Sequence, residues 1–276
     1  MSTMVTNYDI RTLKISSTNP CLIVYLLDQS GSMSERFGNA NHAKSVEVAR
    51  AINEIIYEVA LRCNDNGTIK DRFELAVIGY GKKGDHITPA WEGNLANHWV
   101  QSISKIYASP LGIEDDLPYW IKPYSSDATP MKKAFENALL LCEDWIEWGN
   151  HKDCYPPIII NITDGQATDD SSPYRGLRDV VDRLRSLRTH YGTTNVFNIH
   201  ISSLSGDRIL FPSEVSQNGD GFARLLFELS TPLNEHMMQE AKKRGYTNIT
   251  EGARGYVFNG NNTDLLNFLN IGSNPF

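Results

Sequence analysis

The sequence predicts an α/β fold, in which a mainly parallel sheet carries helices on both faces. Short runs that are apolar at every position alternate along the chain with longer stretches in which apolar residues recur every three or four positions. The short runs are typical of parallel strands buried on both faces, and the longer stretches are typical of amphipathic helices. Because the two kinds of segment alternate, we expect a doubly wound sheet.

The predicted strands begin with residues 21–27, an uninterrupted buried run. The next strand, 73–80, is followed by a polar segment, 81–85, which predicts a hairpin turn. A strand at 86–90 then pairs with it as an antiparallel edge. Further strands are predicted at 158–163, 195–202 and 255–258.

The predicted helices lie between these strands. Pro130 precedes a stretch with helical spacing, and proline is favoured at the first helical position. In residues 91–126 the periodicity fades, so we expect a long loop there, which in a compact domain is usually functional or mobile. Helices are expected at 41–63, 131–145, 177–187, 222–229, 233–243 and 265–269.

The composition is that of a globular protein and excludes several classes. Of 276 residues, 41% are hydrophobic and 21% charged, which argues against disorder. The 26 Lys and Arg against 33 Asp and Glu give a net charge of −7, with no basic stripe. Binding to nucleic acid or to an anionic membrane is therefore not expected. No linker or repeat is visible, so we predict one domain over residues 1–276, with its core at about 20–270.

Two features predict a cytoplasmic location. The first 17 residues contain no apolar segment of the kind that a secretory signal needs. The four cysteines lie far apart without a Cys-x-x-Cys pair, as in a reduced protein with buried thiols. They are Cys21, Cys63, Cys142 and Cys154.

The segment Asp28-Gln29-Ser30-Gly31-Ser32 follows the first predicted strand directly. Ligands of open α/β sheets bind at the carboxyl ends of the strands. A carboxylate and two hydroxyls are hard oxygen donors, which suit Mg²⁺, Mn²⁺ or Ca²⁺. The alternative is an Asx-turn and helix cap, for which the same residues are well suited.

Two further residues favour the metal. Asp164 follows another apolar strand, 158–163, and Thr129 stands at the start of a predicted helix. If these ends converge, five oxygen-bearing side chains surround one point and leave a coordination position open. The predicted metal ligands are Asp28, Ser30, Ser32, Thr129 and Asp164.

With these five residues in this order, the chain resembles a von Willebrand factor type A (VWA) domain with an intact metal-ion-dependent adhesion site (MIDAS). The family motif is Asp-x-Ser-x-Ser, a distant Thr and a distant Asp, and the likeness extends over residues 22–269. It implies a Rossmann-like, six-stranded, doubly wound sheet with one Mg²⁺ at its top. It also implies that Ser30, Ser32 and often Thr129 touch the metal, whereas Asp28 and Asp164 act largely through water.

The resemblance further implies a non-enzymatic module in which an acidic side chain of a protein partner fills the vacant position. Mostly neutral hydroxyl ligands leave the cation much of its positive charge, which attracts a carboxylate. The net charge of −7 opposes an acidic partner only weakly, because salt screens charges beyond about 8 Å.

Three segments of the tail add a second likeness. Residues 209–213, 225–230 and 252–259 resemble a bacterial group of intracellular VWA proteins of the tellurium-resistance and stress-associated type. Members are often encoded beside PP2C-like phosphatases and protein kinases. This implies a signalling or assembly adaptor, with such a phosphatase or kinase as its partner.

Other interpretations remain open. The Asp28–Ser30–Ser32 cluster would also serve a metal-dependent hydrolase or phosphoesterase, although the chain has no Gly-x-Ser-x-Gly elbow and no placed Lys or Arg clamp for a phosphoryl group. In a third interpretation the metal only stiffens the loops. Asp169 and Asp170 either extend the site or cap a helix. The acidic and aromatic loop 114–124 is either a partner-facing rim or a solvated insertion.

Overall fold

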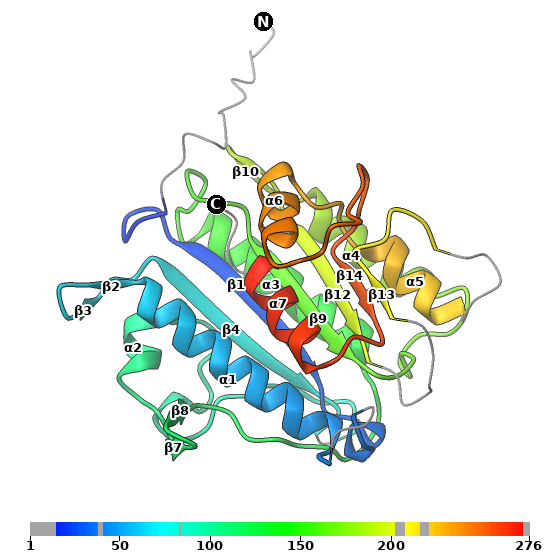
Figure 1. Ribbon diagram of the computed structural model, residues 1–276, viewed down its shortest axis with the longest axis horizontal. Helices are drawn as coiled ribbons and strands as arrows, with labels where there is room; N and C mark the ends of the chain where they lie inside the picture. The colour runs from blue at the N-terminus through cyan, green and yellow to red at the C-terminus, as the bar shows by residue number, and fades with distance from the viewer. Residues whose placement is uncertain (1–14, 38–40, 83, 202–207, 216–220, 273–276) are drawn as a thin grey trace, which may run out of the picture.

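Five parallel strands form the centre of the sheet in this computed structural model, which describes residues 15–37, 41–82, 84–201, 208–215 and 221–272 (Figure 1). Their order is β14-β12-β9-β1-β4, and every neighbouring pair is parallel. These strands are β1 (Cys21–Asp28), β4 (Phe73–Tyr80), β9 (Ile158–Thr163), β12 (Asn195–His200) and β14 (Tyr256–Phe258).

Antiparallel strands flank the parallel centre on both sides. The predicted edge strand is β5, which pairs with β4. The predicted count of six strands is not confirmed, because the described part of the chain contributes eight strands to this sheet. Two-residue strands carry no hydrophobic period and were therefore missed. The antiparallel strands are β5 (Ile87–Pro89), β6 (Gln101–Ser102) and β13 (Ile209–Leu210). Positions 83 and 202, within the predicted turn and strand, lie outside the described residues.

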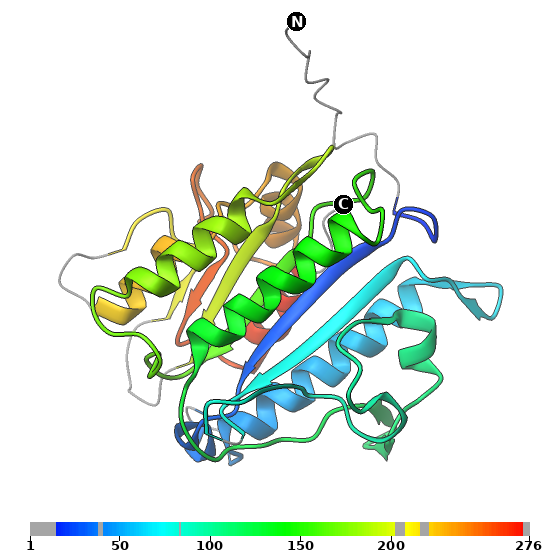
Figure 2. The ribbon, with the colours of Figure 1, turned by 180° about the vertical axis from the view of Figure 1, so that it is seen from behind.

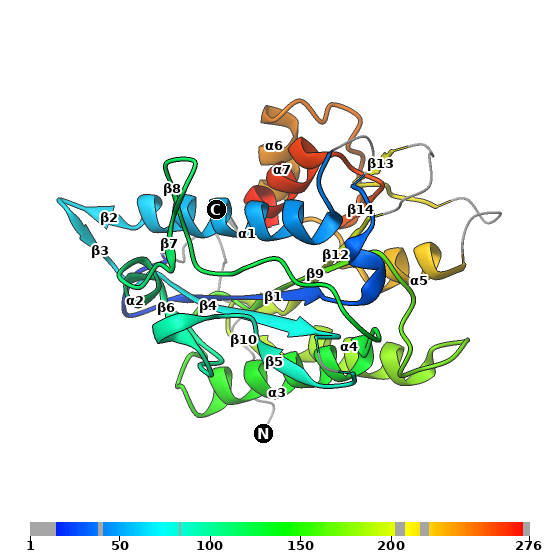
Figure 3. The same ribbon diagram turned by 90° about the horizontal axis from the view of Figure 1, so that it is seen from below.

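Helices cover both faces of the sheet, as Figure 3 shows with the strands edge-on. On one face lie α1, α6 and α7, and on the other lie α3 and α4 (Figures 1 and 2). In chain order the helices are α1 (Lys44–Arg62), α2 (Ile103–Tyr107), α3 (Met131–Glu147), α4 (Arg175–Ser186), α5 (Gly221–Leu229), α6 (Glu235–Lys243) and α7 (Asn262–Gly272).

The side chains of β1 divide the core into two clusters. Ile23 and Tyr25 pack with the apolar face of α1, whereas Leu22 and Val24 pack with α3 and α4. Because successive side chains of a strand point to opposite faces, a strand covered on both sides must be apolar at every position. This explains why β1 shows no alternation and is buried along its whole length.

The predicted long loop at residues 91–126 is not irregular throughout. It contains β6, the five-residue helix α2 and a hairpin of two strands, β7 (Gly112–Glu114) and β8 (Leu117–Tyr119). Trp120 after the hairpin is fully buried, and its Nε1 donates to the carbonyl of Ile106, 2.5 Å away. Elements this short contribute too few residues for a period to be recognised.

No helix in the described part of the chain is both long and apolar enough to cross a membrane. The four cysteines are free and buried, as predicted. The predicted domain bounds and the cytoplasmic location remain predictions.

Candidate functional site

The site lies where the connections of the sheet change direction. From β1 the chain passes through α1 to β4 on one side, whereas β9 lies on the other side of β1 and leads on to β12. Crevices at the carboxyl ends of such neighbouring strands bind ligands in open α/β sheets. Asp28 is the last residue of β1, and Asp164 directly follows β9. The topology therefore brings the two predicted carboxylates to one edge of the sheet.

Asp28 is held by the strand and the loop beside it. Its Oδ2 accepts a hydrogen bond from Thr163 Oγ1 at 2.6 Å, and its Oδ1 accepts one from the Ser30 amide at 2.9 Å. The second bond is the Asx-turn of the alternative interpretation, so turn and site residue coincide in one carboxylate. The Ser30 side chain caps no backbone group of the 3-10 helix Gly31–Ser34 that follows it.

Gly31 allows the first loop to approach the segment before α3. The Gly31 amide donates to the carbonyl of Asp127 at 3.1 Å, and a Cβ on Gly31 would lie 2.9 Å from the carbonyl oxygen of Ser126. A side chain at this position would push the two loops apart. The glycine inside the motif therefore serves the approach of the Ser30–Ser32 loop to Thr129.

Thr129 is fixed by the loop that follows β9. Its amide donates to Thr168 Oγ1 at 3.0 Å, and its carbonyl accepts from the Thr168 amide at 2.9 Å. Asp169 accepts from the backbone amides of Lys132 and Lys133 at 3.1 and 2.8 Å. Asp169 is thus a helix cap, but it caps α3 from another part of the chain, whereas Asp170 caps α4 through the Leu177 amide at 2.8 Å.

The structure brings all five predicted site residues together. Ser30 Oγ lies 3.2 Å from Ser32 Oγ, and Ser32 Oγ donates to Asp164 Oδ1 at 2.6 Å. A Cβ placed on Gly165 would meet both Ser32 Oγ, at 3.7 Å, and Thr129 Oγ1, at 3.8 Å. Asp28, which accepts from the Ser30 amide, completes this cluster of hydroxyl and carboxylate oxygens.

A buried lysine, which the sequence analysis missed, completes the cluster. Lys44 is 1% exposed, and its Nζ donates to Asp164 Oδ2 at 2.6 Å and to Glu35 Oε2 at 3.0 Å. The absence of a Lys or Arg clamp for a phosphoryl group stays a prediction, because the ammonium of Lys44 is bonded to these two carboxylates. Lysines are almost never fully buried, and nothing in the local sequence marks Lys44 as different from the other lysines of the chain.

Burial dominates the electrostatics of Asp28. It raises the pKa of this carboxyl from 3.8 to about 6, hydrogen bonds from Ser30 and Thr163 oppose the shift, and the nearby charge of Asp164 adds to it. Burial disfavours the ionised form because water no longer solvates the charge. A cation next to Asp28 would favour the ionised form again.

The donor set fits a hard divalent cation. Oxygens that are neighbours on an octahedral Mg²⁺ lie about 3 Å apart, because each is about 2.1 Å from the ion. The separations of 3.2 Å between Ser30 and Ser32 and of 2.6 Å between Ser32 and Asp164 lie on either side of this value. No three His, Cys, Asp or Glu side chains form a ligand group within the described ranges; the candidate set here consists of three hydroxyls and two carboxylates.

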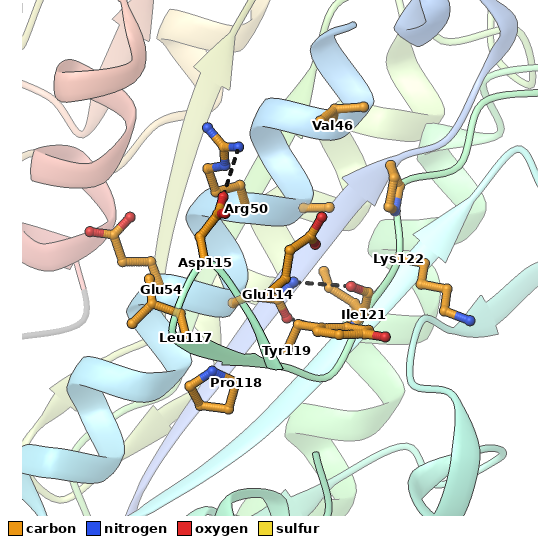
Figure 4. A pocket seen from close by; sticks show the side chains of 13 residues that line it. Val46, Arg50, Glu54, Glu114, Asp115, Leu117, Pro118, Tyr119, Ile121 and Lys122 are labelled. Carbon is orange, nitrogen blue, oxygen red and sulfur yellow. Dashed lines mark hydrogen bonds and ion pairs between the residues drawn. The ribbon is translucent and has the colours of Figure 1, made fainter. Parts of the chain in front are cut away.

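The loop 114–124 builds one wall of a groove of about 520 Å³ against α1 (Figure 4). Asn53 Oδ1 accepts from the amides of Trp120 and Ile121 at 2.9 and 3.1 Å. Arg50 and Asp115 face each other at 3.9 Å. The base of this loop is thus anchored rather than solvated, and its role as a partner-facing rim stays a prediction.

The three tail segments lie together at the far edge of the sheet. Ile209 pairs with Phe258 in the β13–β14 ladder, and Arg254 Nη1 donates to the Ser230 carbonyl at 2.5 Å. The segments are therefore neighbours in space, and the likeness that they carry stays a prediction.

Comparisons with known proteins give no family assignment. No family model matches the chain, and no curated protein matches it. Among solved structures, it is similar to the PilB minor pilin from Streptococcus sanguinis, with 12% identity and a TM-score of 0.47 over 92% of this chain and 61% of that one. It is also similar to the vWF domain of the type V pili tip protein Mfa5 from Porphyromonas gingivalis, with 14% identity and a TM-score of 0.33 over 58% and 44%.

The pilus adhesin RrgA from Streptococcus pneumoniae is a third similar structure, with 15% identity and a TM-score of 0.30 over 55% of this chain and 21% of that one. The chain therefore spans 61%, 44% and 21% of these three proteins.

Proposed function

We propose that the chain is a VWA-type module with a MIDAS, a non-enzymatic protein-binding domain that holds a divalent cation. Asp28, Ser30, Ser32, Thr129 and Asp164 would hold the ion, Mg²⁺ in the first place and Mn²⁺ or Ca²⁺ as alternatives. The observation that carries this proposal is the meeting of the serine pair with Asp164 at the carboxyl ends of β1 and β9.

The ligand set supports a role in binding carboxylates. When bound, the cation would supply a Lewis-acidic, positively charged contact point for an acidic side chain. The three hydroxyls bring no charge, so among the five residues only the carboxylates of Asp28 and Asp164 oppose the charge of the ion. An Asp or Glu of a partner protein is the donor that this arrangement suits best.

The wider role follows from the sequence patterns. We infer a cytoplasmic adaptor in bacterial signalling, stress response or assembly, with a PP2C-like phosphatase or a protein kinase as a candidate partner. The tail segments carry this part of the proposal.

Hydrolysis is the competing function. Lys44, which would have to act as the clamp of a phosphoesterase, is already bonded to Asp164 and Glu35, and Ser32 Oγ donates to Asp164. A screen with generic phosphate and ester substrates distinguishes the two functions. Turnover that Ser30→Ala abolishes would replace the binding function by an enzymatic one.

Isothermal titration with Mg²⁺ and Mn²⁺ tests the metal site directly. Ser30→Ala should weaken binding of both ions by at least about tenfold, because a direct ligand is lost. Ser34→Ala is the matched control: Ser34 ends the 3-10 helix that Ser30 precedes, but its Oγ donates to the carbonyl of Gly31 at 2.7 Å, on the exposed side of the loop. Wild-type protein without uptake of either ion, or equal losses in both variants, would refute the proposal.

A second experiment tests the partner. Proteins that co-purify with the wild-type chain in Mg²⁺ should be released by EDTA and should be absent with Asp28→Ala, yet present with Ser34→Ala. Binding that survives both EDTA and Asp28→Ala would favour the structural role, in which the metal only stiffens the loops.

A further inference from the structure

Lys44 is a buried charge that the proposed metal site does not use as a ligand. It is the first residue of α1, its side chain is 2% exposed, and it forms ion pairs with Asp164 and with Glu35. The Lys44 amide also donates to the Glu35 carbonyl at 2.8 Å, which fixes the start of the helix beside the first loop. Burying an ammonium group is costly unless it is paired.

The two oxygens of Asp164 face different partners. Oδ1 accepts from Ser32 Oγ on the side of the hydroxyl cluster, and Oδ2 accepts from Lys44 Nζ, both at 2.6 Å. Asp164 is fully buried at its side chain, whereas Glu35 is 56% exposed. The main countercharge of the ammonium is therefore the same carboxylate that faces the candidate metal position.

This pairing alters the charge of the site. Among the buried groups, Asp28 and Asp164 together carry −2 when ionised, and Lys44 brings the sum to −1, while Ser30, Ser32 and Thr129 are neutral. Glu35, which also pairs with Lys44, is 56% exposed, so water screens its charge and it is left out of this sum. A divalent ion bound there would leave a net charge of +1. Without the ammonium the sum would be zero, and an incoming carboxylate would lose most of its electrostatic attraction, which is strong in a site of low dielectric constant.

We propose that Lys44 determines the specificity of the site for anionic partner groups: it compensates Asp164, which weakens the hold on the cation and leaves that cation positively charged for a carboxylate. The inference rests on the proposed metal site and deepens it. In a purely structural role, Lys44 would only hold α1 against the loop after β9, and changing it would alter stability without tightening metal binding.

The test uses the full chain and the metal alone. Lys44→Met retains the apolar stem and removes the charge, and Lys44→Arg retains the charge. By isothermal titration, Lys44→Met should bind Mg²⁺ and Mn²⁺ at least about tenfold more tightly than wild type, because the repulsive charge is lost. Lys44→Arg should stay within about threefold of wild type. Affinity in Lys44→Met that is equal to or weaker than that of wild type overturns the inference.

Acetate serves as the probe for a partner carboxylate. Acetate that displaces water from bound Mn²⁺ lowers the water-proton relaxivity. The acetate concentration needed for half of that decrease therefore measures the affinity of the bound ion for a carboxylate. Lys44→Met should need at least about fivefold more acetate than wild type and Lys44→Arg about the same. Equal requirements in Lys44→Met and wild type contradict the inference.

Folding is followed by circular dichroism in EDTA and in excess Mg²⁺. If Lys44→Met is unfolded in EDTA and folded in Mg²⁺, the divalent ion replaces the ammonium as the countercharge of Asp164, as the inference requires. A variant that stays unfolded in both overturns it. If wild type takes up no ion, the proposed metal site itself fails; if wild type binds and Lys44→Met binds no better, only the role of Lys44 fails.

Discussion

Asp28 performs two tasks that oppose each other. It closes the Asx-turn and accepts a hydrogen bond from Thr163, yet its burial makes the negative charge costly, as the raised pKa of about 6 indicates. Residues that suit a ligand better than they suit the fold are common at functional sites. The carboxylate is therefore the residue at which stability and function should separate most clearly.

Asp28→Asn should remove metal binding without unfolding the protein. The amide can still accept from Ser30 and can donate to Thr163 Oγ1, while the buried charge disappears. In EDTA at neutral pH we expect the free energy of unfolding, measured with urea, to be unchanged or higher by about 1–2 kcal/mol. Mg²⁺ affinity should fall at least about tenfold. A loss of more than about 2 kcal/mol would show that the charge itself stabilises the fold.

The same variant tests the pH dependence. Because the pKa of Asp28 is about 6 in the folded chain against the ordinary 3.8, the folded state takes up this proton at higher pH than the unfolded state. The group therefore adds stability as the pH falls from about 7 to about 5. In EDTA, wild type should gain stability relative to Asp28→Asn over this range in urea unfolding. A constant difference contradicts the raised pKa.

At the scale of elements, the helix that follows Thr129 is capped by a residue from another part of the chain. Asp169 and Asp170 are adjacent in sequence but cap two different helices, α3 and α4. Only α3 begins directly after Thr129. Replacing either aspartate should therefore lower the stability by a similar amount, but only the loss of Asp169 should affect the candidate site.

Asp169→Ala and Asp170→Ala should each reduce the free energy of unfolding by about 1 kcal/mol, the usual effect of a lost cap. Asp169→Ala should in addition weaken Mg²⁺ binding several-fold, because the start of α3 no longer holds Thr129 in place. Asp170→Ala should bind Mg²⁺ like wild type. Urea unfolding and titration calorimetry measure the two effects. Equal metal affinities in the two variants would show that the cap by Asp169 does not hold Thr129 in place.

Across the whole molecule, a chain of buried polar groups connects the strands beneath the site. Tyr80 donates to Asn161 Oδ1 at 2.8 Å, Asn161 donates to Asn198 Oδ1 at 3.1 Å, and Asn198 donates to Ser230 Oγ at 3.0 Å. The chain of bonds crosses from β4 through β9 and β12 to the end of α5. Buried polar groups are costly when unpaired, so this network specifies how the strands and α5 pack.

Asn161→Ala should lower the free energy of unfolding by about 2–3 kcal/mol, because Tyr80 and Asn198 each lose a buried partner. The folded fraction should still bind Mg²⁺ with nearly wild-type affinity, since Asn161 lies inside β9 rather than at its end. Asn137→Ala, which removes a side-chain bond to the Lys133 carbonyl within α3, should cost less than about 0.5 kcal/mol. A comparable loss in both variants contradicts a special role of the network.

The same scale shows what the sequence can predict. The central strands could be predicted because burial on both faces leaves an unbroken apolar run. The meeting of the five candidate residues could be predicted because they stand at strand and helix ends that a doubly wound sheet brings together, whereas their role as metal ligands stays a prediction. Helix α2 and strands β6 and β13 were missed because five or fewer residues carry no period. Lys44 and the cap by Asp169 were missed for another reason: both depend on contacts between segments distant in the chain, which local patterns do not encode.

A crystal of the full chain grown in Mn²⁺ tests the central claim most directly, through the anomalous scattering of the ion. We predict one peak among Ser30, Ser32, Thr129 and the two aspartates, within about 2.3 Å of both serine hydroxyls. A peak elsewhere, or none at millimolar Mn²⁺ with the loops otherwise ordered, would contradict the account.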